Sequence, residues 1–159
     1  MAFWLVKSEP GEYSYSDLER EGRTEWSGVH NAVALRHLKG MRAGDGLLFY
    51  HSGAERAVVA VARVLDSPRP DPNDDRGSWT VGVGPDRALA APVPLAVIRT
   101  DPALSELPML RMTRLSVVPV TRDQWARILA HAGERGPARS GGQGRTRGSR
   151  SNQRAAARR

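Results

Sequence analysis

Three short segments of the chain combine aromatic rings or extended backbone with small polar side chains. They are Lys7–Pro10, Trp26–Asn31 and Phe49–Ser52. A nucleobase offers a π-face for stacking and an edge for hydrogen bonds, so a pocket that holds one needs both kinds of group. The composition of these segments therefore indicates a binding site for a flat, polar, heteroaromatic ring.

Trp26 is our candidate for the stacking platform of such a site. It lies between two predicted helices, follows the polar Thr24 and Glu25, and has no apolar periodicity around it. Stacking of a base on an aromatic side chain is worth about 1–3 kcal/mol. The alternative is an indole that only fills the core between the helices. Ser27 and Val29 follow it and belong to the same set of ligand-binding candidates.

Lys7, Ser8 and Glu9 follow the first predicted strand, where we expect side chains to reach the mouth of a pocket. A carboxylate only accepts hydrogen bonds, so Glu9 suits the exocyclic amine of cytosine better than the carbonyl oxygen of thymine. The alternative role of Glu9 is that of a capping or surface carboxylate.

Each of the remaining candidates has more than one possible role. Asn31 either caps the following helix or turns its amide toward the ligand. His51 either contacts phosphate or satisfies a turn. Arg114 and Ser116 fall on one face of a late predicted strand and either reach the ligand backbone together or leave Arg114 in a salt bridge. The set completes the ligand-binding candidates: Asn31, Tyr50, His51, Ser52, Arg114 and Ser116.

The pattern of apolar residues and turn signals predicts an α+β fold. Apolar, β-prone runs predict strands over Phe3–Lys7, Leu47–His51, Val58–Leu65, Ser78–Val83 and Leu115–Val120. Capping signals predict helices that end near Glu21, Lys39 and His131, and Pro92–Ile98 fits a strand or a short helix. Strands and helices do not alternate, so we expect a curved, mixed or antiparallel sheet or pseudo-barrel of five or six strands with peripheral helices.

The net charge of +7 belongs to the C-terminal segment. Residues 133–159 contain eight arginines and one glutamate, whereas residues 1–132 contain 16 basic and 16 acidic side chains. Because the segment has no aromatic or large aliphatic side chain, we expect one domain over 1–132 and a disordered Arg/Gly-rich tail over 133–159. The tail either makes salt-dependent phosphate contacts or only keeps the chain soluble.

Several classes of site are missing from the sequence. It has no cysteine, which excludes disulfides and thiolate metal sites and fits a cytoplasmic location. It has no phosphate-binding loop, nucleophile elbow or zinc-type histidine pair. No apolar stretch approaches the roughly 20 residues that span a bilayer, and no secretory leader is apparent. We therefore expect no catalytic residue, metal, cofactor or membrane partner, and leave the oligomeric state open.

Motifs along the chain resemble EVE domains, including stand-alone bacterial ones, in order and spacing over about Met1–Ala132. They are Trp4–Pro10, Trp26–Asn31, Gly44–Asp45 with Phe49–Ser52, Pro70–Pro72, and Arg114–Val117 with Pro119–Val120. The resemblance implies a PUA-like fold related to YTH domains. It also implies a nucleic-acid-binding module that accepts a flipped, modified base into an aromatic-walled pocket and performs no reaction on it. EVE domains favour modified cytosine in DNA, whereas YTH domains read methylated adenine in RNA.

One motif departs from the family pattern. Many members have Arg-Asn-Tyr after the tryptophan, whereas this chain has His30, Asn31 and Ala32. The change removes one ring and one planar cation, so the ligand preference does not carry over. Two alternatives therefore stay open beside the base reader. One is an RNA-binding or base-modifying enzyme that uses Glu9, Lys7 or His30, and the other is an accessory protein with a degenerate pocket.

Overall fold

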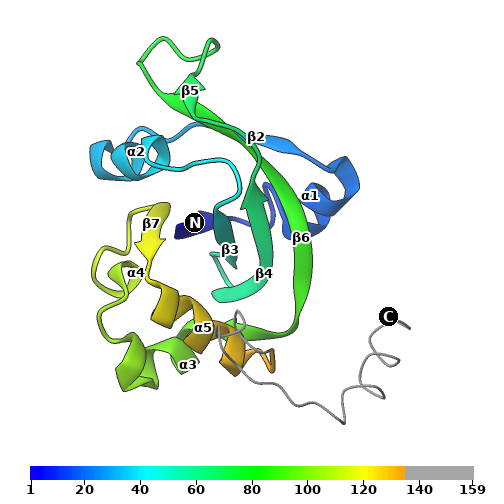
Figure 1. Cartoon of the computed structure of the whole chain (residues 1–159), viewed down its shortest axis with the longest axis vertical. Helices are drawn as coiled ribbons and strands as arrows, with labels where there is room; N and C mark the ends of the chain where they lie inside the picture. The colour runs from blue at the N-terminus through cyan, green and yellow to red at the C-terminus, as the bar shows by residue number, and fades with distance from the viewer. Residues whose placement is uncertain (135–159) are drawn as a thin grey trace.

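A curled sheet of six strands forms an open half-barrel in the computed structural model, which describes residues 1–134 (Figure 1). The strand order is β2–β6–β4–β3–β1–β7, and a short seventh strand, β5, pairs with β6. Only β1 and β3 run parallel, and every other pair is antiparallel. The strands are β1 (Phe3–Ser8), β2 (Thr24–Trp26), β3 (Gly46–His51), β4 (Ala57–Val64), β5 (Arg69–Pro70), β6 (Trp79–Pro94) and β7 (Val117–Val120).

Five α-helices lie around this sheet within residues 1–134, so the predicted α+β fold, a curved mixed sheet with peripheral helices, is confirmed. They are α1 (Tyr15–Glu21), α2 (Ala32–Lys39), α3 (Leu95–Thr100), α4 (Pro108–Arg111) and α5 (Arg122–His131), with a 3₁₀ turn over Pro102–Leu104. None of these helices is long and apolar enough to cross a bilayer. The predicted disordered tail lies outside the described residues, apart from Gly133 and Glu134.

The three predicted helices start at the residues that carry capping signals. Ser14 and Thr121 each open a complete capping box, before α1 and α5. Asn31 caps α2, since its Oδ1 accepts the N–H groups of the second and third helical residues. Both alternatives for Pro92–Ile98 hold in part, since β6 ends at Pro94 and α3 begins at Leu95. Sequence patterns missed α4, which begins at Pro108 and has no side-chain cap.

Strand β6 is much longer than predicted. The sequence indicated a strand that ends at Val83. In the structure, β6 continues past Val83 through Pro85 and Pro92, and the whole strand has 16 residues. Its pairing with β4 shifts register twice, near Val58 and near Val61, and such bulges let a strand with prolines bend and continue. The long curved β6 therefore wraps around β4 and reaches β2 at its N-terminal end (Figure 1).

The centre of the core is Phe49 in β3, which is fully buried. Three rings meet it edge-to-face: Tyr15 at 5.5 Å, Trp26 at 5.6 Å and His51 at 5.7 Å between centroids. Aromatic pairs in this arrangement contribute about 0.5–1.5 kcal/mol each beyond the area they bury. Phe49 therefore joins α1, β2 and β3 at one point.

A buried carboxylate, Asp101, joins the 3₁₀ turn to α5. It accepts hydrogen bonds from Arg127 Nε at 2.6 Å and from the Ala103 N–H at 2.9 Å, and it faces His131 Nε2 at 2.6 Å. The hydrogen bond from the Arg127 guanidinium, followed by that from His131, holds the pKa of the Asp101 carboxyl well below its usual range.

We predict that Asp101→Asn lowers the thermal unfolding midpoint at pH 7 and reduces the loss of stability in acid. A carboxyl whose folded-state pKa is depressed stabilises the fold above its unfolded pKa, about 3.9, and this contribution disappears as the pH falls. Circular dichroism melts between pH 7 and pH 2.5 should show the two midpoints converging below about pH 4. Asp75→Asn, at an exposed loop carboxylate, is the control. Parallel curves over the whole pH range would contradict the assignment.

Candidate functional site

A cavity of about 340 Å³ opens where the C-terminal end of β1 faces β2. Seven of the twelve candidate residues line it, namely Lys7, Ser8, Glu9, Trp26, Ser27, Val29 and Ser116. Five residues that sequence reasoning missed complete the lining: Glu12, Tyr13, Thr24, Glu25 and Gly28. Two of the three segments that suggested a ring-binding site, those around Lys7–Glu9 and Trp26–Val29, therefore meet in one hollow.

Trp26 lies in strand β2 and not, as predicted, in an irregular connection between helices. It pairs with Val81 of β6, and its carbonyl accepts a hydrogen bond from Thr80 Oγ1 at 3.0 Å. Its partly exposed ring packs against Phe49 with an interplanar angle of 86° and also lines the cavity. The indole is thus supported by the core and reaches the cavity, which combines the two alternatives given for it.

Lys7 connects the end of β1 to the segment that precedes β7. Its N–H donates to the Ser116 carbonyl at 2.9 Å, and its Nζ donates to the Thr113 carbonyl at 2.9 Å. The ammonium also lies 5.9 Å from the centre of the Tyr50 ring. Burial lowers the pKa of the Lys7 ammonium. The geometry makes Lys7 a structural cation at the cavity wall.

Glu9 holds an exposed carboxylate at the edge of the cavity. Its Oε1 accepts the Gly11 N–H at 2.5 Å, and Oε2 has no hydrogen-bond partner within residues 1–134. Gly53 of the β3–β4 loop approaches the carboxylate so closely, at φ +77°, that a methyl group there would clash with it. The capping alternative for Glu9 therefore holds for Oε1, whereas Oε2 accepts no hydrogen bond within residues 1–134 and lies next to Gly53.

Five candidates lie outside the cavity lining: Asn31, Tyr50, His51, Ser52 and Arg114. Asn31 caps α2, and Tyr50 is buried. His51 accepts the Tyr15 N–H at Nε2, so its other nitrogen, Nδ1, carries the proton and donates to Glu55 Oε1 at 2.7 Å. The Ser52 N–H donates to the Ser8 carbonyl at 2.9 Å. These side chains and backbone groups support the neighbouring elements.

The prediction that Arg114 and Ser116 share a strand face is wrong, because β7 begins only at Val117. Ser116 lines the cavity, whereas Arg114 lines a separate hollow of about 310 Å³ next to it. Arg114 is exposed and forms no ion pair within residues 1–134, so the salt-bridge alternative does not hold there. Without strand alternation, the two side chains diverge.

Tyr13 is the most informative lining residue that the sequence did not reveal. Its ring is partly buried, its hydroxyl donates to Glu21 Oε1 at 2.8 Å, and its carbonyl accepts from Ser8 Oγ at 2.5 Å. Burial raises the pKa of its phenol. Tyr13 directly precedes the N-cap of α1, and Leu18 follows at the position of a hydrophobic staple. That pattern predicts packing of Tyr13 against Leu18 but gives no sign of a cavity.

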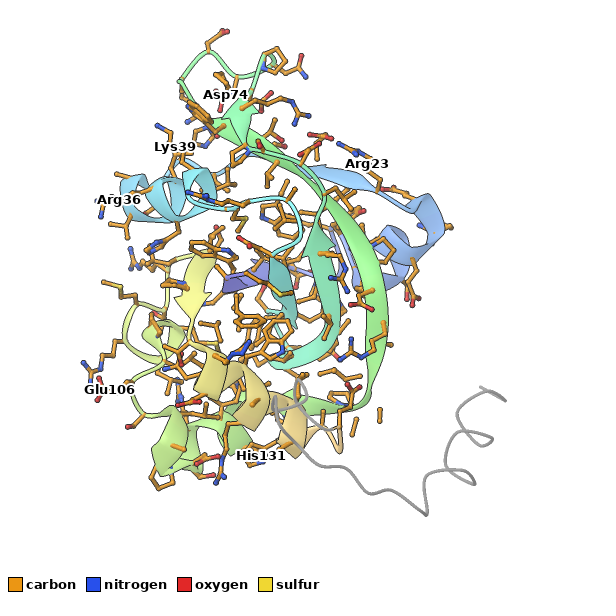
Figure 2. The ribbon with its side chains drawn as sticks, viewed as in Figure 1. Arg23, Arg36, Lys39, Asp74, Glu106 and His131 are labelled. Atoms are coloured by element: carbon orange, nitrogen blue, oxygen red, sulfur yellow. The ribbon has the colours of Figure 1, made fainter. Side chains whose placement is uncertain are left out.

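His30 lies outside the cavity and fixes a neighbouring loop. It faces Asp74 at 2.5 Å through Nε2 and Arg76 at 3.3 Å through Nδ1. Asp74 lies in the loop between β5 and β6 (Figure 2), and the backbone N–H of Arg76, followed by His30, lowers the pKa of its carboxyl. His30 therefore anchors this loop and is not placed to exchange protons with a ligand in the cavity.

The cavity is rich in hydrogen-bond acceptors. Three carboxylates, those of Glu9, Glu12 and Glu25, line it together with one ammonium, that of Lys7. Ion pairs with Arg23 at 3.0 Å and with Arg69 neutralise Glu25. Within residues 1–134 no group of three His, Cys, Asp or Glu side chains is placed to hold a metal. Such a lining accepts hydrogen bonds from an amine edge and repels a phosphate.

Solved structures from several organisms share this fold. A protein from Rhodopseudomonas palustris is 35% identical, with a TM-score of 0.79 over 84% of this chain and 94% of that chain. One from Agrobacterium tumefaciens is 29% identical, with a TM-score of 0.81 over 87% of this chain and 100% of that chain. Human thymocyte nuclear protein 1, solved in complex with 5-methylcytosine-containing DNA, is 23% identical, with a TM-score of 0.76 over 84% of this chain and 99% of that chain.

Sequence comparison agrees with these structural matches. The full human thymocyte nuclear protein 1 is 26% identical over 162 aligned positions, which cover 80% of this chain and 72% of that protein. The EVE domain model matches residues 2–131, which include every strand, every described helix and the whole lining of the cavity. The chain belongs to the EVE domain family.

Proposed function

We propose that this protein binds nucleic acid and holds one extruded base in the cavity beside Trp26, without performing a reaction on it. The observation that carries the proposal is the Trp26 ring, which the core supports at Phe49 and which lines an acceptor-rich cavity. The complex of human thymocyte nuclear protein 1 with 5-methylcytosine-containing DNA supports nucleic acid as the partner and modified cytosine as the preferred base.

The size and walls of the cavity suit a base. A volume of about 340 Å³ lies within the range of small-ligand pockets, about 300–1,000 Å³. Trp26 and Tyr13 bring aromatic rings to it from different elements. Many family members have a tyrosine where this chain has Ala32, and in our proposal Tyr13 supplies the second ring instead. The buried Val29 offers apolar contact to a 5-methyl group.

The edge of the base is read by acceptors. The unpaired oxygen of Glu9 accepts a hydrogen bond from an exocyclic amine, which cytosine and adenine carry and thymine lacks. Because the human relative was solved with 5-methylcytosine-containing DNA, our proposal takes modified cytosine in DNA as the ligand. Phosphate contacts then come from other cations, including the arginines that the sequence carries in residues 133–159.

Two of the three groups that an enzyme at this site could use, Lys7 and His30, are not placed for proton transfer to a base. A general acid or base must lie within hydrogen-bond reach of the reacting atom. The Lys7 ammonium is already bonded to the Thr113 carbonyl, and His30 is held outside the cavity by Asp74. Nucleoside analysis by mass spectrometry, after incubation of the protein with modified DNA and RNA, should show unchanged bases. A modified product would overturn this part of the proposal.

We predict that Trp26→Ala raises the dissociation constant for single-stranded DNA with one 5-methylcytosine by about 5- to 150-fold, the equivalent of the lost stacking energy of about 1–3 kcal/mol. Fluorescence anisotropy with labelled oligonucleotides measures it. Trp79→Ala is the matched control, because Trp79 lies outside the cavity and packs under Lys39 Nζ at 4.8 Å. Wild-type affinity in the Trp26 variant would exclude the indole as a stacking platform.

We predict that Glu9→Gln reduces the preference for 5-methylcytosine over thymine at the same position by about tenfold. The amide can donate to a thymine carbonyl, whereas the carboxylate can only accept, and a hydrogen bond to a charged group is worth about 1.5–3 kcal/mol. Competition binding with the two oligonucleotides gives the ratio. Glu12→Gln changes another carboxylate of the cavity and should leave the ratio near the wild-type value. An unchanged ratio in the Glu9 variant would remove Glu9 from base recognition.

A further inference from the structure

The segment Arg111–Arg114 runs from the last residue of α4 into the turn before β7 and lies beside the cavity. The Lys7 ammonium donates to the Thr113 carbonyl at 2.9 Å, and Ser116, which lines the cavity, accepts the Lys7 N–H. The segment also lines the neighbouring hollow of about 310 Å³ with Val33 of α2 and the buried Leu115. Lys7 therefore fixes the position of this segment relative to any base held in the cavity.

Met112 presents an apolar side chain to solvent in this segment. It is 49% exposed, one of three large apolar side chains recorded as exposed within residues 1–134. Its backbone is fixed, since its N–H donates to the Pro108 carbonyl at 2.8 Å and its carbonyl accepts the Leu115 N–H at 3.2 Å. An exposed thioether on a fixed turn can enter an apolar space without the ordering cost of a mobile loop.

Two arginines, Arg111 and Arg114, line the same hollow as Met112. Arg114 forms no ion pair within residues 1–134, and Arg111 pairs at 3.3 Å with Glu106, where both side chains are more than half exposed. An ion pair this exposed holds its partners weakly. Arg36 projects from the outer side of α2, on the side of the molecule that carries α4 and this segment (Figure 2). The segment thus offers the positive charge that the acidic cavity lacks.

We propose that Arg111–Arg114 is a wedge that contacts duplex nucleic acid beside the cavity. Met112 enters the gap that the extruded base leaves in the stack, and Arg111 and Arg114 contact the flanking phosphates. Apolar side chains inserted at a base step, with arginines on the adjacent backbone, are a known way to stabilise unstacked duplexes. This inference rests on the proposed function, because a gap exists only where a base is extruded from a duplex.

The test compares a duplex and a single strand that carry the same 5-methylcytosine. Met112→Ala should raise the dissociation constant for the duplex about tenfold and change that for the single strand less than twofold. A 2-aminopurine next to the modified base reports unstacking in the duplex by an increase in fluorescence. Wild-type protein should cause this increase, and the Met112→Ala variant should not. Leu65→Ala, at another exposed large apolar side chain, is the matched control. The thermal midpoint of each variant checks folding.

Arg114→Ala should reduce the slope of log affinity against log salt concentration for the duplex by about one, as loss of one phosphate contact does. Arg114→Lys should restore the slope. If Met112→Ala weakens duplex and single-strand binding equally, or weakens neither, the wedge is overturned. Binding of the single strand by the wild-type protein would still support the base pocket. Failure of the wild-type protein to bind any of these nucleic acids would overturn the proposed function and the wedge together.

Discussion

The edge-to-face packing of Trp26 on Phe49 is the interaction on which the site depends. Phe49 is fully buried, and it also contacts Tyr15 of α1 and His51 of its own strand, so its position is fixed from several sides. Trp26 packs on this fixed ring from the short strand β2, remains partly exposed and lines the cavity.

The parallel pairing of β1 with β3 explains why some candidates contact the cavity and others support it. The register places Lys7 beside Tyr50 and Ser8 beside His51, so the two strands end together. The end of β1 turns into the cavity, whereas His51 bonds to the first residue of α1 and to Glu55. By holding the start of α1, His51 fixes the segment that carries Tyr13. Its contribution to the site is therefore indirect.

Local signals predicted the parts of the fold that local interactions determine. Capping residues Ser14, Asn31 and Thr121 gave the starts of three helices, and apolar runs gave four of the strands around the core. The length of β6 could not be predicted, because Pro85 reads as a strand end unless bulges in the pairing with β4 are known. Tyr13 and Asn31 show the same limit, since a polar or aromatic residue near a cap has no direction until its neighbours are placed.

Charge separates the two tasks of the proposed reader. Residues 1–132 carry no net charge, and the cavity holds more carboxylates than cations, so the attraction of a phosphate backbone is weak where the base is read. A base edge that donates hydrogen bonds gains from that same field, whereas a carbonyl edge or a phosphate loses. In the proposed function, the phosphate contacts come from other cations, such as Arg114, which does not line the cavity, and the arginines in the sequence of residues 133–159. The phosphate-binding cations are then separate from the acceptors that contact the base. Tighter binding of phosphate therefore does not change which base the cavity prefers.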